Sequence, residues 1–74
     1  MAIQIVMDRN GDTRHQFDDE DRVAVALAED RFRQLTAEGF RAVALARDGE
    51  PGQLLRTFDA QVKRTLFIPP LEGG

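Results

Sequence analysis

The sequence predicts a single α+β domain in which one main helix packs on a mixed sheet of four to five strands. Three observations lead to this class. Residues near the N-terminus alternate between two faces with the two-residue period of a strand, and residues 22–38 have apolar side chains at helical steps of three and four. The last third of the chain returns to short apolar runs separated by glycine and proline. With 74 residues, the chain has room for one sheet and one helix and for no second domain.

The N-terminal residues predict a β-hairpin. A first strand is expected at residues 2–7, and the Asn10-Gly11 pair is the strongest short hairpin signal, with a returning strand at 13–17. The faces of the first strand carry Ile3, Ile5 and Met7 against Gln4 and Val6. Phe17 is expected in the core. His15 is interpreted as a solvated or cross-strand residue and not as a proton shuttle, because no local spacing places a carboxylate or nucleophile beside it.

An acidic run at residues 18–21 precedes the helical pattern. Asp18 or Asp19 is predicted to cap the helix, with the following carboxylates at its positive end. Consecutive acids on one turn point in different directions, so a divalent metal site is not favoured. The helix is expected over residues 22–38 with Gly39 as the C′ residue. Its core-facing stripe is formed by Val25, Ala28, Phe32 and Leu35.

The remaining segments predict three further strands, at residues 40–46, 53–58 and 65–68. Asp-Gly and Pro-Gly signals place a turn at 47–52, and residues 59–64 form a turn or single helical turn. The order is strand, strand, helix, strand, strand, strand. We expect the last strand to lie parallel to the first in the centre of the sheet, with the helix on one face.

Composition limits the function classes. The formal charge of −3 argues against nucleic-acid binding, which needs a basic surface. The absence of cysteine excludes disulfides and thiolate chemistry, and a single histidine excludes a multi-histidine metal site. No apolar run is long enough to cross a bilayer, and the N-terminus has no signal-peptide pattern. A cytoplasmic protein with no membrane association is therefore expected.

The C-terminal residues carry the most specific signal. Thr65 to Ile68 reads as a buried strand, Pro69 and Pro70 end its pairing because proline has no backbone N–H, and the chain finishes in Gly73-Gly74. Two glycines without Cβ atoms suit a carboxyl terminus that must enter a narrow enzyme channel. A frayed, unreactive end is the plainer interpretation of the same glycines.

The segment Leu66-Phe67-Ile68-Pro69-Pro70-Leu71-Glu72-Gly73-Gly74 resembles the C-terminus of MoaD-type sulfur carriers. More broadly, it is similar to the ends of ubiquitin-like β-grasp modifiers. The close match covers these nine residues, and the rest of the chain matches in its order of elements. The resemblance implies a ubiquitin-like β-grasp domain at 1–68, in ββαβββ order, and an extended tail at 69–74.

The resemblance also implies a role. A partner enzyme of the ThiF or ubiquitin-activating type would use ATP to adenylate the Gly74 carboxylate, with Gly73 fitting the channel and Pro69, Pro70 and Leu71 positioning the tail. The chain itself would be no enzyme, with no catalytic residue, metal or bound cofactor. A conjugating enzyme, a JAB-type peptidase and target proteins are the further expected partners. The only lysine, Lys63, is a possible acceptor for chains of this modifier.

Three functions remain open at this point. Conjugation joins Gly74 to an amine of a target protein, as in ubiquitin-like systems, including bacterial ones. Sulfur transfer of the MoaD or ThiS type converts Gly74 into a thiocarboxylate. A passive interaction domain would use neither glycine. Arg56, Phe58 and Leu66 are candidates for docking a partner on the sheet, but alternation does not tell which face the helix leaves open.

Overall fold

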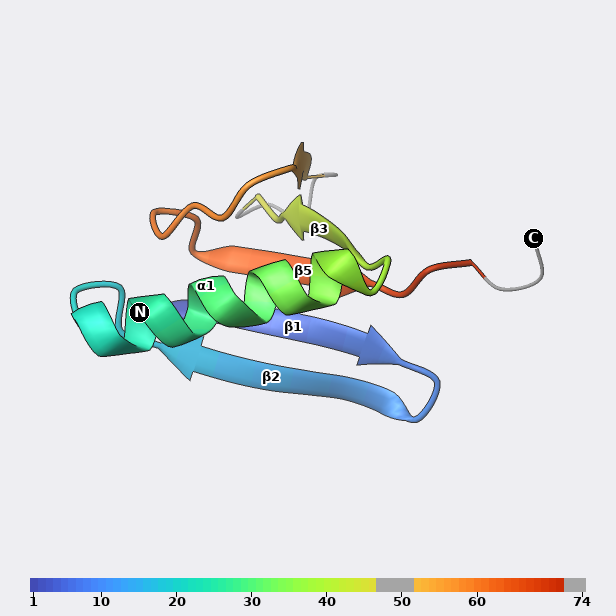
Figure 1. Cartoon of the computed structure of the whole chain (residues 1–74), viewed down its shortest axis with the longest axis horizontal. Helices are drawn as coiled ribbons and strands as arrows, with labels where there is room; N and C mark the ends of the chain where they lie inside the picture. Colours follow the sequence, from blue (N-terminus) through green and yellow to red (C-terminus); the bar gives the residue numbers. More distant parts are fainter. Residues whose placement is uncertain (47–51, 72–74) are drawn as a thin grey trace.

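The computed structural model describes residues 1–46 and 52–71. Within them, one helix lies across one face of a five-stranded mixed sheet (Figure 1). The elements are β1 (Ala2–Asp8), β2 (Gly11–Phe17), α1 (Arg22–Ala37), β3 (Arg41–Ala44), β4 (Gln53–Leu55) and β5 (Arg64–Ile68). The predicted α+β class is confirmed. No helix in the described part of the chain has the length and apolar character needed to cross a membrane.

The hairpin of β1 and β2 forms as predicted. The two strands are antiparallel, with Ala2 opposite Phe17 at one end and Asp8 opposite Gly11 at the other. The Asp8 carboxylate accepts a hydrogen bond of 3.2 Å from the backbone N–H of Asn10, which closes the turn. Gly11 has a φ of 119°, which favours glycine at this position. The second strand begins at Gly11, two residues before its predicted start at residue 13.

The centre of the sheet is formed by the first and last strands. The strand order is β2-β1-β5-β3-β4, with β1 and β5 parallel and β3 antiparallel to β5. The predicted central parallel pair is thus confirmed. The short β4 forms the far edge by pairing with β3. The predicted turn at 47–52 lies outside the described residues except for Gly52.

The cap of α1 differs from the prediction. Asp21 is the N-cap, with φ −93° and ψ 114°, and its carboxylate accepts from the backbone N–H groups of Val23 at 3.0 Å and Ala24 at 3.3 Å. Asp18 instead forms the preceding turn by accepting from the N–H of Glu20 at 2.9 Å. The choice of Asp18 or Asp19 as cap was wrong because the helix begins only at Arg22, and no acidic residue lies in its first turn.

The core lies between α1 and the sheet in two clusters. One contains Ala2, Phe17 and Ala28, and the other contains Phe32, Ala42 and Phe67. Phe58 packs against both clusters, with ring centroids 6.3 Å from Phe17 and 5.9 Å from Phe32. The predictions that Phe17, Ala28 and Phe32 belong to the core are confirmed. Ala42 is 1% exposed, and its small side chain is in the cluster where the helix meets β3.

Phe58 also explains why the fourth strand is shorter than predicted. The strand was expected to continue to Phe58, but β4 ends at Leu55. Leu55 packs toward the core, so a continued two-residue alternation would direct Phe58 to the opposite face. By leaving the strand after Leu55, the chain brings the Phe58 ring back under the helix. The third strand is likewise shorter than predicted, spanning Arg41–Ala44.

A buried glutamine joins the sheet to the helix. Gln4 is 1% exposed, its Nε2 donates to the Ala28 carbonyl at 3.0 Å, and its Oε1 accepts from Arg31 Nη1 at 2.8 Å. Burial of an amide is costly unless both of its ends are satisfied. These two hydrogen bonds satisfy them, so the face of β1 that carries Gln4 can pack under the helix.

His15 lies opposite Gln4 on the helix-covered side of β2. Partial burial, and then the nearby positive charge of Arg31, lower the His15 pKa from its ordinary value of 6.5. A histidine with a lowered folded-state pKa contributes stability above the unfolded pKa and loses it as the pH falls through the folded value. We expect the midpoint of unfolding in urea to fall on acidification below about pH 6.5, and His15→Gln to reduce that dependence. A His15 titration midpoint at or above 6.5 by NMR would contradict this expectation.

Candidate functional site

The candidate site is the point where β5 ends and the tail begins. β5 is held on both sides, because Leu66 pairs with Ile5 of β1 and with Val43 of β3. Ile68, the last residue of the strand, still pairs with Arg41. Pro69 cannot continue the ladder because it has no N–H. The tail therefore starts from a strand that is paired on both sides, and it runs out past the end of α1 (Figure 1).

The C-terminal end of α1 contacts the first residues of the tail. The N–H of Gly39 donates to the Thr36 carbonyl at 3.1 Å and the N–H of Phe40 donates to the Leu35 carbonyl at 3.0 Å, which is a Schellman motif. Gly39 has a φ of 101°, so the prediction that it is the C′ residue is confirmed. A Cβ at Gly39 would lie 3.2 Å from Cβ and 3.4 Å from Cγ of Pro70. The Pro70 ring thus packs against the bare backbone of Gly39.

The predicted tail residues can now be placed. Pro69 and Pro70 are exposed, and Leu71 is 95% exposed. Gly73 and Gly74 lie outside the described residues. The contact between Pro70 and Gly39 was not predicted, because the helix-end pattern and the proline pair are thirty residues apart in the chain. No local periodicity relates them.

The strand register shows which sheet face the helix leaves open. Residues paired across strands lie on the same face. Ile5 pairs with Arg14 and Leu66, and Leu66 pairs with Val43, so all four lie on the face opposite the helix-covered Gln4. The apolar side chains on this open face are those of Ile3, Ile5, Met7, Val43, Leu54, Leu66 and Ile68, with Arg14, Arg41 and Arg64 among them.

The structure places the three docking candidates, Arg56, Phe58 and Leu66, in different environments. Leu66 lies on the open face, half-buried between its neighbours. Phe58 does not, since it is part of the core beneath the helix, and its selection as a sheet-face residue was wrong. Arg56 is exposed just after β4. Of the three candidates, Leu66 is therefore the one that lies in β5, the strand that leads into the tail.

Lys63 lies in the turn immediately before β5. Its side chain is 62% exposed, and Nζ is 2.8 Å from Oδ2 of Asp19. The N-terminal amine is 3.9 Å from Oδ1 of the same carboxylate. The hydrogen bond from Lys63 is the main cause that lowers the pKa of Asp19. The one lysine is thus accessible, at the opposite end of β5 from the tail.

The candidate site is a short exposed segment, residues 69–71, that leaves the end of β5. In residues 1–46 and 52–71, no three histidine, cysteine, aspartate or glutamate side chains gather in a way that could hold a metal ion.

Comparison of the chain with protein-family models, with curated proteins and with solved structures gives no match. The site is therefore interpreted from its tail sequence and its geometry.

Proposed function

We propose that the chain is a ubiquitin-like β-grasp protein modifier whose Gly74 carboxylate is activated and transferred to an amine of a target protein. The observation that carries the proposal is the origin of the tail. The tail leaves a central strand, its root is fixed by Pro70 on Gly39, and Leu71 beyond it is 95% exposed. One helix over a mixed sheet with parallel first and last strands is compatible with a β-grasp fold.

The chemistry would take place in partner enzymes. A ThiF or ubiquitin-activating-type enzyme binds ATP, and the Gly74 carboxylate attacks its α-phosphate, which gives an acyl-adenylate and pyrophosphate. A cysteine thiolate then displaces AMP to form a thioester. Finally, a lysine amine displaces the thiolate and forms an isopeptide bond, releasing one proton. A JAB-type peptidase would hydrolyse the isopeptide bond, which releases the Gly74 carboxylate and the lysine amine.

The contribution of this chain is positioning. Holding a reacting group in a productive orientation lowers a barrier by several kcal/mol, in the general range of about 7–11 kcal/mol for ideal intramolecular cases. Here the strand pairing of Ile68 with Arg41 fixes where the tail starts, and two consecutive prolines favour an extended exit. Leu66 and Val43 form the next pair on the open face, two residues before that exit, and would contact the activating enzyme.

One observation favours a second candidate function, a sulfur carrier of the MoaD or ThiS type. Pro69 and Pro70 follow the last strand directly, as in the sulfur-carrier tails that this segment resembles. In that case a sulfur donor, and not a cysteine of a transfer enzyme, displaces AMP, and Gly74 ends as a thiocarboxylate. A third possibility is an interaction domain whose tail is chemically inert.

Mass spectrometry of the protein and its conjugates separates these functions. Trypsin cuts after lysine and arginine, so a target lysine would carry the branch Thr65–Gly74, because Arg64 is the last basic residue. A protease that cuts after glutamate would leave only Gly73-Gly74, because Glu72 precedes them. Both branches on the same lysine would support conjugation. Unconjugated protein heavier by the difference between sulfur and oxygen would support the sulfur carrier instead.

Deletion of Gly74 tests the shared chemistry. We expect conjugates or thiocarboxylate to fall at least about hundredfold, because the carboxylate is shortened by one residue and no longer reaches the ATP phosphate. Val23→Ala serves as the control, since Val23 is 69% exposed on α1 and far from the tail in sequence. Unchanged cellular function after the deletion, with neither conjugates nor thiocarboxylate formed by the wild-type chain, would leave only the inert interaction domain.

A further inference from the structure

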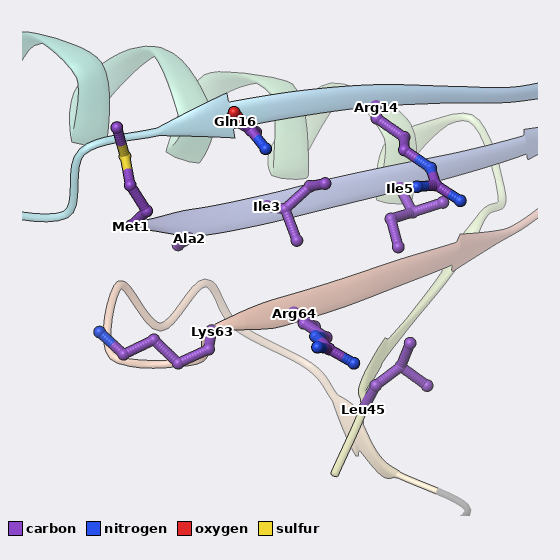
Figure 2. Close-up of a pocket in the computed structure, with 9 residues that line it drawn as sticks. All are labelled: Met1, Ala2, Ile3, Ile5, Arg14, Gln16, Leu45, Lys63 and Arg64. Atoms are coloured by element: carbon purple, nitrogen blue, oxygen red, sulfur yellow. The ribbon is translucent and has the colours of Figure 1, made fainter. Parts of the chain in front are cut away.

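A groove on the open sheet face lies at the opposite end of β5 from the tail. It has a volume of about 630 Å³ and is formed by the beginnings of β1 and β5 together with Leu45 and the end of β2. Ile3, Ile5 and Leu45 provide its apolar surface. Figure 2 shows Ile3 and Ile5 on β1 with Arg14 on one side and Arg64 on the other. The groove is therefore apolar at its centre and basic at both sides.

The charged side chains that line the groove are of one sign, and one of them, Arg64, has no acidic partner among the described residues. Every charged side chain that lines it in the described residues is basic: Arg14, Lys63 and Arg64. Lys63 is paired with Asp19 and points away from Ile3 and Ile5 in Figure 2. Arg14 has an exposed contact with Asp12 at 3.4 Å, and no ion pair within residues 1–46 and 52–71 involves Arg64. This local excess is opposite in sign to the net charge of −3.

We infer that this groove binds a segment of a partner protein that carries apolar side chains next to a carboxylate. The apolar side chains would cover Ile3, Ile5 and Leu45, and the carboxylate would accept hydrogen bonds from Arg64 and Arg14. Guanidinium groups suit carboxylates because their N–H donors match the two oxygens. A polyanion such as nucleic acid is disfavoured by the net charge of −3 and by the apolar centre of the groove.

This inference is independent of the proposed modifier function. Arg64 begins β5 and Ile68 ends it, so the groove and the tail are separated by four residue steps, roughly 13 Å along an extended strand. A partner in the groove would leave Pro69 to Leu71 uncovered. The surface would therefore allow a second protein to recognise the chain while its tail is occupied.

The test uses the full chain and three capped hexapeptides in which leucine alternates with glutamate, glutamine or lysine. Backbone amide shifts in ¹H–¹⁵N NMR spectra report binding at Ile3, Ile5 and Leu45. We expect the glutamate peptide to shift these amides and to bind at least about tenfold more tightly than the glutamine peptide. The lysine peptide should not bind. Equal binding of all three peptides, or shifts confined to α1, would overturn the inference.

Charge reversal sharpens the test. Arg64→Glu should weaken the glutamate peptide about tenfold or more and permit binding of the lysine peptide, and Arg14→Glu should act in the same direction. Arg22→Glu, with the same charge change on α1, should leave both affinities unchanged. Tighter binding of inorganic phosphate or duplex DNA to the groove would contradict a protein partner. Dimerisation of the free chain that is lost in Arg64→Glu would assign the groove to a second copy instead.

Discussion

Replacing Phe67 with alanine is expected to unfold most of the protein at 25 °C. Phe67 is 0% exposed in the central strand, opposite Val6 of β1 and Ala42 of β3, and its ring is 5.7 Å from that of Phe32. Removal of a buried phenylalanine side chain costs about 3–5 kcal/mol. A domain below about 70–80 residues rarely has more than about 3–5 kcal/mol of total stability. The substitution therefore removes most or all of the free energy of unfolding.

Circular dichroism in a urea titration measures this effect. The matched control is Leu71→Ala, which also removes a large apolar side chain, but from a position that is 95% exposed. The control should retain the wild-type midpoint, because the side chain contacts mainly water. A Phe67→Ala protein with a free energy of unfolding within about 1 kcal/mol of wild type would contradict the position of Phe67 at the centre of the core.

Replacing Gly39 with alanine is expected to destabilise the fold and to displace the root of the tail. Gly39 has a φ of 101°, which costs a residue with a Cβ about 1–3 kcal/mol. The new Cβ would also lie 3.2 Å from Cβ of Pro70, closer than ordinary van der Waals contact. We therefore expect a loss of about 2–4 kcal/mol of unfolding free energy, the sum of strain and crowding. Under the proposed modifier function, conjugation through the displaced tail should decrease more than the folded fraction does.

The hairpin offers a matched control for the strain alone. Gly11 has a φ of 119°, and a Cβ there would meet nothing within 4 Å. Gly11→Ala should cost the strain and leave the tail unaffected. In a double-mutant cycle with Pro70→Gly, the Gly39→Ala cost should fall by about 0.5–1.5 kcal/mol. Zero coupling between the two positions would show that Pro70 is not held against Gly39.

Elements with a strong local period could be predicted from the sequence. The helix at 22–38 was predicted within one residue of its observed end, because its apolar stripe and the following glycine are local signals. The hairpin follows from Asn10-Gly11, and the central position of the last strand follows from the order of elements. Each depends on neighbouring residues or on the few topologies that such an order permits.

Features that depend on contacts between distant segments could not be predicted. The helix covers the face of β1 that carries Gln4 and not the face that carries Ile3 and Ile5. A count of apolar residues on β1 favours the opposite choice, and the hydrogen bonds that Gln4 donates to Ala28 and accepts from Arg31 allow its amide to be buried. Phe58 was misplaced for a similar reason, because its partners Phe17 and Phe32 are far away in the chain.

In the candidate site, too, the local features could be predicted from the sequence and the contacts between distant segments could not. The tail residues Pro69, Pro70 and Leu71 were identified from the sequence, because the prolines end strand pairing and the segment resembles the ends of MoaD-type sulfur carriers. The contact of Pro70 with Gly39 and the basic groove could be found only from the structure. Arg14 and Arg64 are fifty residues apart, and only the pairing of β2 and β5 with β1 places them on two sides of Ile5.

The parallel pairing of β1 and β5 has a mechanical consequence. The N-terminus enters β1 at one end of the pair, and the tail leaves β5 at the other end (Figure 1). A pull on the tail against the N-terminus is thus directed along both strands in opposite senses, and it loads their hydrogen bonds together in shear instead of opening them one at a time. A machine that unravels this protein from its tail must break that whole ladder at once before any residue of the sheet is released.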